Sequence, residues 1–262
     1  MDSTVTSTID LIRRRVSLRN YAPRPITPEH LDLILESAMR APTAGNMMLY
    51  SIIVVEDPAK KQALSVTCDH QPFIAKAPLV LVFLADMQRW YDYYQLSGVK
   101  EFRREQGEDF TSPDEGSFLL ACCDALIAAQ NAVIAAESLG IGSCYIGDIM
   151  ENIETHRELL QLPDWTFPVA MACFGYYPGE RPQPRPRFDR RFIVFTDAYR
   201  RLSEGEFAEM FAGSEAKFNP GNRFGARNIG QETYARKTGA EFAREMARSV
   251  RKALEAWNGK KL

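Results

Sequence analysis

AAESLGIGSCYIGD, residues 135–148, runs from a small-residue apolar segment into a glycine turn, a short apolar segment and a second turn. The preceding residues continue the small apolar composition back to about residue 115, broken by few polar side chains. This composition predicts a long helix over 115–139 that lies centrally, because small side chains let neighbouring backbones approach closely. Residues 140–148 then read as a turn, a short strand and another turn.

Outward from this stretch, helices and strands mix without strict alternation. Strands are expected at 49–57, 77–86 and 166–175, with a further strand at 192–197 (FIVFTD). Helices are expected at 4–14, 28–40, 58–66, 150–160 and 231–257. Thr27, Pro28 and Glu29 mark the start of the second helix. The pattern predicts an α+β fold, with a central mixed β-sheet covered by helices and the long helix at its centre.

The composition excludes several classes of protein. A chain of 262 residues with a net charge of −2 is expected to form one elaborated domain and not to bind nucleic acid. The five cysteines are odd in number and include no CxxC spacing, which favours reduced thiols in the cytoplasm over disulfides or zinc. The three histidines are scattered, so no metal site is expected. No signal peptide or membrane span is recognised in the sequence.

Four arginines lie within RRRVSLRNY, residues 13–21. If residues 15–19 are extended, Arg15, Ser17 and Arg19 lie on one side over roughly 13 Å, with Val16 and Leu18 on the other. Two guanidinium groups and a hydroxyl on one edge suit an anionic ligand that has phosphate and ring acceptors. The alternative is that Arg13 to Arg15 only complement the negative end of the first helix.

Three other stretches could present groups to a ligand. APTAGN, residues 41–46, is a loop between a helix and a strand. YIGD, residues 145–148, ends a strand with a glycine, where another backbone approaches closely or the chain bends. RPR, residues 185–187, holds two guanidinium groups in a stiff segment. Each pattern alone is weak.

The order of the four stretches, RxSxRxY, APTAGN, AAESLGIGSCYIGDI and PRPR, resembles the nitroreductase superfamily over most of residues 8–195. It is most similar to the branch of oxygen-insensitive nitroreductases and NADPH:flavin oxidoreductases. The resemblance implies a nitroreductase-like fold in an intertwined homodimer. Residues 1–262 would form one FMN-dependent domain with an insertion near 87–113 and a C-terminal extension over 200–262.

The resemblance also implies an FMN site. Its first stretch would contact the phosphate, ribityl chain and pyrimidine edge, the APTAGN loop would meet the ring, and YIGD would lie against it. A basic pair in RPR would grip the phosphate. The residues that match are Arg15, Val16, Ser17, Arg19, Pro42, Thr43, Asn46, Tyr145, Ile146, Gly147, Asp148, Arg185 and Arg187. Part of each site would come from the other subunit.

The implied activity is that of a cytoplasmic FMN-dependent NAD(P)H oxidoreductase. It would reduce nitroaromatic, quinone or flavin acceptors by ping-pong hydride transfer, with no side chain needed as acid or base. Arg223 and Arg227 would read the NADPH 2′-phosphate, or lie in a solvated loop. Where many relatives carry Gln-Pro-Trp, this chain has Met48, Leu49 and Tyr50. Alternatives are a specialised enone reductase, dehalogenase or dehydrogenase, and a non-catalytic flavin-binding module.

Overall fold

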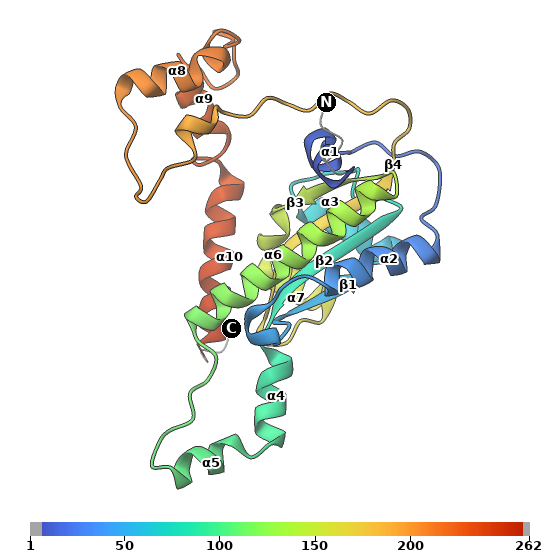
Figure 1. Ribbon diagram of the computed structural model, residues 1–262, viewed down its shortest axis with the longest axis vertical. Coiled ribbons are helices and arrows are strands. Elements are labelled where there is room, and N and C mark those ends of the chain that lie inside the picture. Colours follow the sequence, from blue (N-terminus) through green and yellow to red (C-terminus); the bar gives the residue numbers. More distant parts are fainter. Residues whose placement is uncertain (1–6, 259–262) are drawn as a thin grey trace. The chain divides into compact units, whose positions relative to one another are not determined.

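The computed structural model describes residues 7–258 and divides into two compact units. The larger unit contains the chain up to Pro184 together with the chain from Glu245 onward, and the smaller unit spans Arg185–Arg244. Figure 1 shows the helices and strands of both units. The sheet, and every predicted site residue before residue 185, belong to the larger unit.

A four-stranded sheet forms the centre of the larger unit, in the order β1-β2-β4-β3. Every pair of neighbouring strands is antiparallel, so the expectation of a mixed sheet holds only for one isolated parallel bridge between Ser17 and Ser143. The strands β2 and β4 are buried along their whole length because both faces of the sheet are covered. The strands are β1 (Tyr50–Val54), β2 (Leu79–Asp86), β3 (Ile141–Ile146) and β4 (Thr166–Tyr176).

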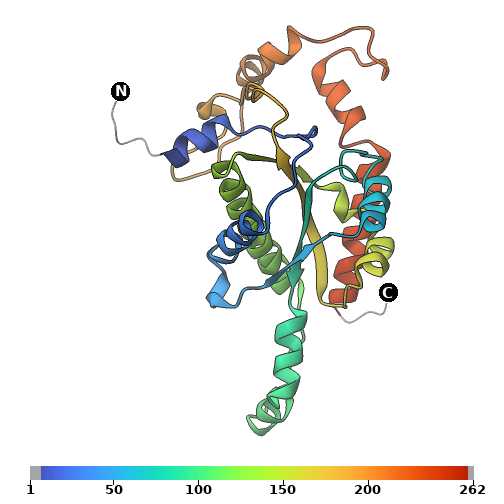
Figure 2. The ribbon, with the colours of Figure 1, turned by 90° about the vertical axis from the view of Figure 1, so that its right-hand side faces the viewer.

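Helices cover both faces of this sheet. Figure 2 shows the sheet nearly edge-on, with α6 (Glu115–Ser138) and α2 (Pro28–Met39) on one side and α3 (Pro58–Thr67) and α7 (Ile153–Leu160) on the other. The expected long central helix is confirmed as α6. Its buried face is made mostly of alanines, which brings its backbone close to α2 and β2.

By length and composition alone, α6 could cross a membrane. Half of its most apolar segment is buried inside the protein, however, where it packs against the sheet and α2. Two carboxylates, Asp124 and Glu137, are among its buried residues. The apolar composition of α6 is therefore accounted for in large part by its place in the core.

The insertion near 87–113 contains two short helices, α4 (Gln88–Leu96) and α5 (Val99–Glu105), which extend away from one end of the sheet (Figure 1). The base of α4 is fixed to the core. Trp90 Nε1 donates a hydrogen bond of 2.8 Å to Met47 O, and the Tyr91 ring lies 3.8 Å from that of Trp165. Beyond the base, Leu96 and other apolar side chains of this insertion are exposed.

Two sequence predictions were wrong in the described part of the chain. Residues 192–197 form no strand, because Asp189 caps a short 3₁₀ turn there and the following apolar side chains are exposed. The expected helix over 231–257 is two helices, α9 (Ile229–Arg236) and α10 (Glu241–Trp257). The break lies at Gly239, whose N–H donates a hydrogen bond to Tyr234 O. A Cβ at this position would meet the Tyr234 ring. The remaining helices are α1 (Ser7–Arg14) and α8 (Glu204–Glu215).

Candidate functional site

The arginine-rich segment runs beside β3. Leu18 N donates to Ser143 O at 2.9 Å, and Leu18 is buried while Ser17 and Arg19 are exposed. Gly142 permits this approach, because a Cβ there would lie 2.7 Å from Leu18 Cδ2. The structure therefore brings two of the predicted stretches, residues 15–19 and the strand that ends in YIGD, side by side.

Arg15 lies against the end of α6, and one of its hydrogen-bond donors is unpaired among the described residues. Its Nε is buried and has no hydrogen-bond partner among the described residues. The neighbouring Glu137 is buried, accepts from Tyr177 Oη at 2.9 Å and forms an ion pair of 2.9 Å with Arg181. Burial raises the pKa of Glu137 although Arg181 and Arg15 oppose this. The unused Arg15 donor is the kind of group that an anionic ligand would satisfy.

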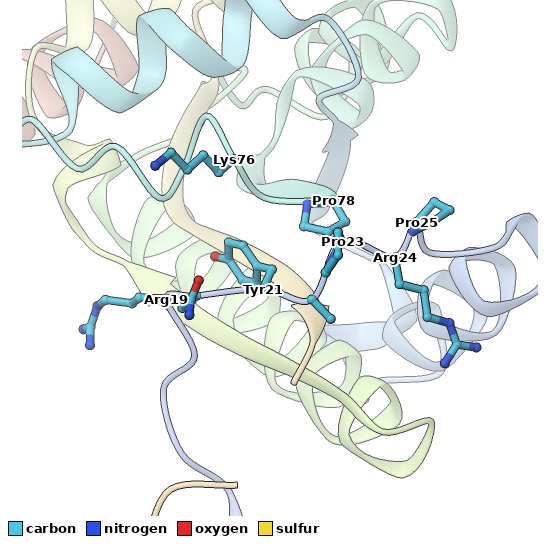
Figure 3. Close-up of a pocket in the computed structure, with 9 residues that line it drawn as sticks. Arg19, Tyr21, Pro23, Arg24, Pro25, Lys76 and Pro78 are labelled. Carbon is cyan, nitrogen blue, oxygen red and sulfur yellow. The ribbon is translucent and has the colours of Figure 1, made fainter. Parts of the chain in front are cut away.

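A pocket of about 340 Å³ lies beside Arg19. Figure 3 shows the head groups of Arg19 and Lys76 on the same side of the Tyr21 ring, whereas Arg24 points the other way. Arg24 stacks on the Tyr176 ring, with its guanidinium carbon 3.9 Å from the ring centre. Lys76 is a cation that sequence reasoning missed, because nothing in the local sequence IAKAP distinguishes it from a solvated lysine.

The YIGD turn forms part of a mostly apolar pocket of about 480 Å³. Tyr145, Ile146 and Gly147 line it together with Leu126 and Gln130 of α6 and with Met150. Tyr145 Oη donates to Gln130 Oε1 at 3.4 Å. The helix side of this pocket was not predicted, because residues of α6 carry no motif.

Asp148 faces other polar groups at the same turn. It accepts a 2.7 Å hydrogen bond from Gln71 Nε2, another residue that the sequence did not single out. Glu151 lies one turn further on, is buried, and has one carboxyl oxygen without a partner among the described residues. Burial, and then the nearby charge of Asp148, raise the pKa of Glu151 to about 8. This carboxyl is therefore largely protonated at neutral pH.

The APTAGN loop lies before β1, at the sheet edge opposite β3. Three strand spacings, about 14 Å, separate the two edge strands. The loop contains a 3₁₀ turn, and Gly45, Asn46 and, just after the loop, Met48 have φ of 55°, 57° and 51°. Thr43 Oγ1 accepts from Met48 N at 2.8 Å across it. Within one chain, the structure does not bring this loop together with residues 15–19.

The remaining predicted residues lie in the smaller unit. Arg187 lines a cavity of about 550 Å³ there, together with Arg191, Lys217, the carboxylates of Asp189 and Glu209, and apolar side chains. Arg185 is exposed. Arg223 stacks on Phe224, and the Arg227 amide donates to Gln231 Oε1 at 2.8 Å. The roles of these four arginines in holding phosphate groups stay predictions.

The chain is similar to known flavin enzymes. It is 34% identical over 197 residues to an FMN reductase (NADPH) of Bacillus subtilis, which covers 74% of this chain and 75% of the relative. It is 30% identical over 200 residues to an oxygen-insensitive NADPH nitroreductase of Salmonella typhimurium, over 76% and 78% of the two chains. The solved structure of NfrA2 of Bacillus megaterium superposes with a TM-score of 0.79 at 28% identity, over 95% of this chain and 97% of that one.

The expected family and fold are confirmed by these comparisons. The matched region of the family model covers the arginine-rich segment, the APTAGN loop, α6, and the strands up to the end of β4, and it leaves the smaller unit outside. With residues 12–176 matching the model of the nitroreductase family, the chain belongs to that family.

Proposed function

We propose that this chain is an FMN-dependent NAD(P)H oxidoreductase that reduces small acceptors such as nitroaromatics, quinones or flavins. The observation that carries the proposal is the row of donors at Arg15, Ser17 and Arg19 held against β3, with an apolar pocket at the end of the same strand. Bound FMN would supply the hydride chemistry at its N5 atom. The protein would bind, orient and shield it.

The residues present fit such a group. Arg15 Nε has no partner among the described residues and Arg19 is exposed, so the guanidinium groups of both can donate to phosphate or to the pyrimidine edge. Lys76 adds a second positive charge beside Arg19. The apolar pocket at Tyr145 to Gly147 suits a flat ring. Positive charge near the pyrimidine edge would stabilise the anionic reduced flavin.

The proposal includes a homodimer. The APTAGN loop and residues 15–19 lie toward opposite edges of the sheet, so a site that uses both needs a second copy of the chain. The outer face of α6 carries an apolar stripe at helical spacing, which a partner would cover. Its exposed members are Leu119, Leu120, Leu126 and Ile127.

The proposal also covers the location of the protein and its partners. We infer a cytoplasmic protein, since all five cysteines are free thiols. We infer that neither nucleic acid nor a membrane is a partner, since the net charge is −2 and the apolar helix α6 is half buried. An enone reductase, dehalogenase or dehydrogenase would use the same cofactor site and differ only in the acceptor.

Absorption spectra of the purified protein test this function. About one FMN per chain is expected, with bleaching on anaerobic addition of NADPH or NADH. Bound flavin that neither donor bleaches would indicate the non-catalytic flavin-binding module instead. A colourless protein that cannot be reconstituted with FMN would contradict the proposal.

A further inference from the structure

Asp124 lies in the middle of α6 and is 3% exposed. Its carboxylate reaches out of the helix to the APTAGN loop and the residues that follow. Ala44 N donates to Oδ1 at 3.1 Å and to Oδ2 at 3.3 Å, and Leu49 N donates to Oδ2 at 3.2 Å. One side chain therefore holds both ends of the segment 44–49.

This arrangement is costly for a residue that only packs in a core. Among the described residues, no lysine or arginine forms an ion pair with Asp124, so backbone amides alone compensate its charge. A buried carboxylate without a cation is unfavourable unless its hydrogen bonds are good. The neighbouring buried positions of α6 are alanines, which serve packing at no such cost.

The segment that Asp124 holds does not have a relaxed backbone. Asn46 and Met48 both have positive φ, and such residues persist only where the surroundings fix them. Two carbonyls of the segment accept hydrogen bonds from side chains of α4. Trp90 Nε1 donates to Met47 O at 2.8 Å, and Arg89 Nη1 donates to Met48 O at 3.4 Å. The loop is thus fixed by α6 through its amides and by α4 through its carbonyls.

We propose that Asp124 is a positioning residue, whose carboxylate fixes residues 43–49 in the shape that presents Thr43 and Asn46 to the flavin. This inference rests on the proposed function, because the ligand that the loop meets is the FMN of that site. Asp124 itself contacts neither FMN nor acceptor. It acts through the loop, and through the Ala44 and Leu49 amides in particular.

The test replaces Asp124 by asparagine, which keeps the shape but turns one acceptor into a donor that faces backbone N–H groups. Asn131→Ala is the matched control, since Asn131 lies two turns further along α6 and donates to Ser37 O of α2 at 3.1 Å. Hydrogen–deuterium exchange over residues 43–49 reports on the loop in the apoprotein. Fluorescence titration with FMN reports on binding.

In Asp124→Asn we expect exchange over residues 43–49 to be at least about 10-fold faster and the FMN Kd to rise by about 10-fold or more, corresponding to one charge-assisted hydrogen bond. Asn131→Ala should change neither, even at a similar loss of thermal stability. If Asp124→Asn does not fold, Asp124→Glu keeps both acceptors but displaces them by one methylene, and the same loosening and weaker FMN binding are expected.

The possible failures differ from one another. Unchanged exchange over residues 43–49 would show that Asp124 does not hold the loop. Faster exchange with an unchanged FMN Kd would show that the loop is held for some other purpose. Both results overturn the inference. A wild-type protein that binds no FMN would instead overturn the proposed function, while the exchange experiment would still report whether Asp124 holds the loop.

Discussion

Replacing Arg19 should weaken ligand binding without affecting the stability of the fold. Its side chain is exposed at the rim of the pocket and contributes little to the core. Replacing it with alanine removes a charge-assisted hydrogen bond worth about 1.5–3 kcal/mol, so we expect the FMN Kd to rise by about 10- to 100-fold with little change in Tm. Arg13→Ala, at an exposed arginine of α1, is the control. Stoichiometric FMN retention in Arg19→Ala would mean that the anion site is elsewhere.

Glu151 should make stability depend on pH in an unusual direction. Folding raises its pKa from about 4.5 to about 8, so between these values the folded state retains a proton that the unfolded state releases. Below about pH 4.5 this pKa shift has no effect on the free energy of unfolding. As the pH rises toward 8, the shift lowers that free energy progressively. An ionised Glu151 would lie near the negative charges of Asp148, Asp69 and Glu245. Burial lowers the pKa of the nearby His156, so this histidine is neutral and does not compensate them.

Glu151→Gln removes this titration. Urea unfolding at pH 5 and pH 8.5 should show little difference between variant and wild type at the lower pH, and a more stable variant at the higher one. Glu158→Gln, at an exposed residue of α7, should show no such divergence. If Glu151→Gln instead loses stability equally at both pH values, Glu151 is ionised in the folded protein at neutral pH.

Individual site residues differ in how far the sequence could place them. Arg15, Ser17 and Arg19 were predicted because their two-residue period in an extended segment is visible in the chain itself, and the family resemblance then implied that they contact FMN. Gln71, Lys76 and Gln130 were not predicted, because only tertiary packing brings them near Asp148, Arg19 and Tyr145. Asp124 is one of the few polar side chains in the apolar run that begins at about residue 115, and it belongs to no motif. One of its partners is the amide of Leu49, and a proline at that position would have no N–H for Asp124.

Among the elements, α6 has an N-terminus that is fixed by a capping box. Asp114 accepts from Ser117 N at 2.9 Å and Ser117 Oγ accepts from Asp114 N at 2.7 Å, which forms a capping box. Asp114→Ala should cost about 1 kcal/mol in the free energy of unfolding, measured by urea titration. Asp109→Ala, in the preceding loop, should cost much less. Equal effects of the two changes would mean that the cap adds nothing to the stability of α6.

The outer stripe of α6 yields a prediction about assembly. Leu119 is 65% exposed, and a glutamate there would place a charge within the proposed interface. We expect Leu119→Glu to convert a dimer to a monomer in light scattering after gel filtration, with the fold retained. Leu96→Glu, at an exposed leucine of α4, is the control. A wild-type protein that is monomeric at micromolar concentration would contradict the homodimer.

The elements themselves were largely predictable, and their failures have physical causes. The predicted bounds of the helix α6 and of all four strands lie within a few residues of the observed ones. In these segments the composition and the spacing of apolar residues indicate the same kind of element. The strand at 192–197 was wrong because an apolar run becomes a strand only if a neighbouring strand pairs with it. Sheet direction was also beyond the sequence, since strands apolar on both faces suggest parallel pairing, whereas β2 and β4 are antiparallel strands covered on both faces.

For the whole molecule, the two compact units suggest a division of tasks. The family model matches the larger unit, which contains the donors at residues 15–19 and the apolar pocket. The smaller unit contributes arginines on loops, and most of it belongs to the C-terminal extension over 200–262. Choice of electron donor is a property that such a unit could set without altering the hydride chemistry.

Replacing Arg223 and Arg227 tests whether the smaller unit sets the choice of electron donor. Neither guanidinium forms an ion pair with the described residues of the smaller unit, so both can bind an added phosphate. Replacing both with alanine should raise KM for NADPH by about 10-fold or more, through the loss of contacts to the 2′-phosphate, and leave KM for NADH and both kcat values nearly unchanged. Steady-state kinetics with a quinone acceptor measures all four constants. Equal rises in KM for the two donors would mean that these arginines do not read the 2′-phosphate, and no change in either would place them in a solvated loop.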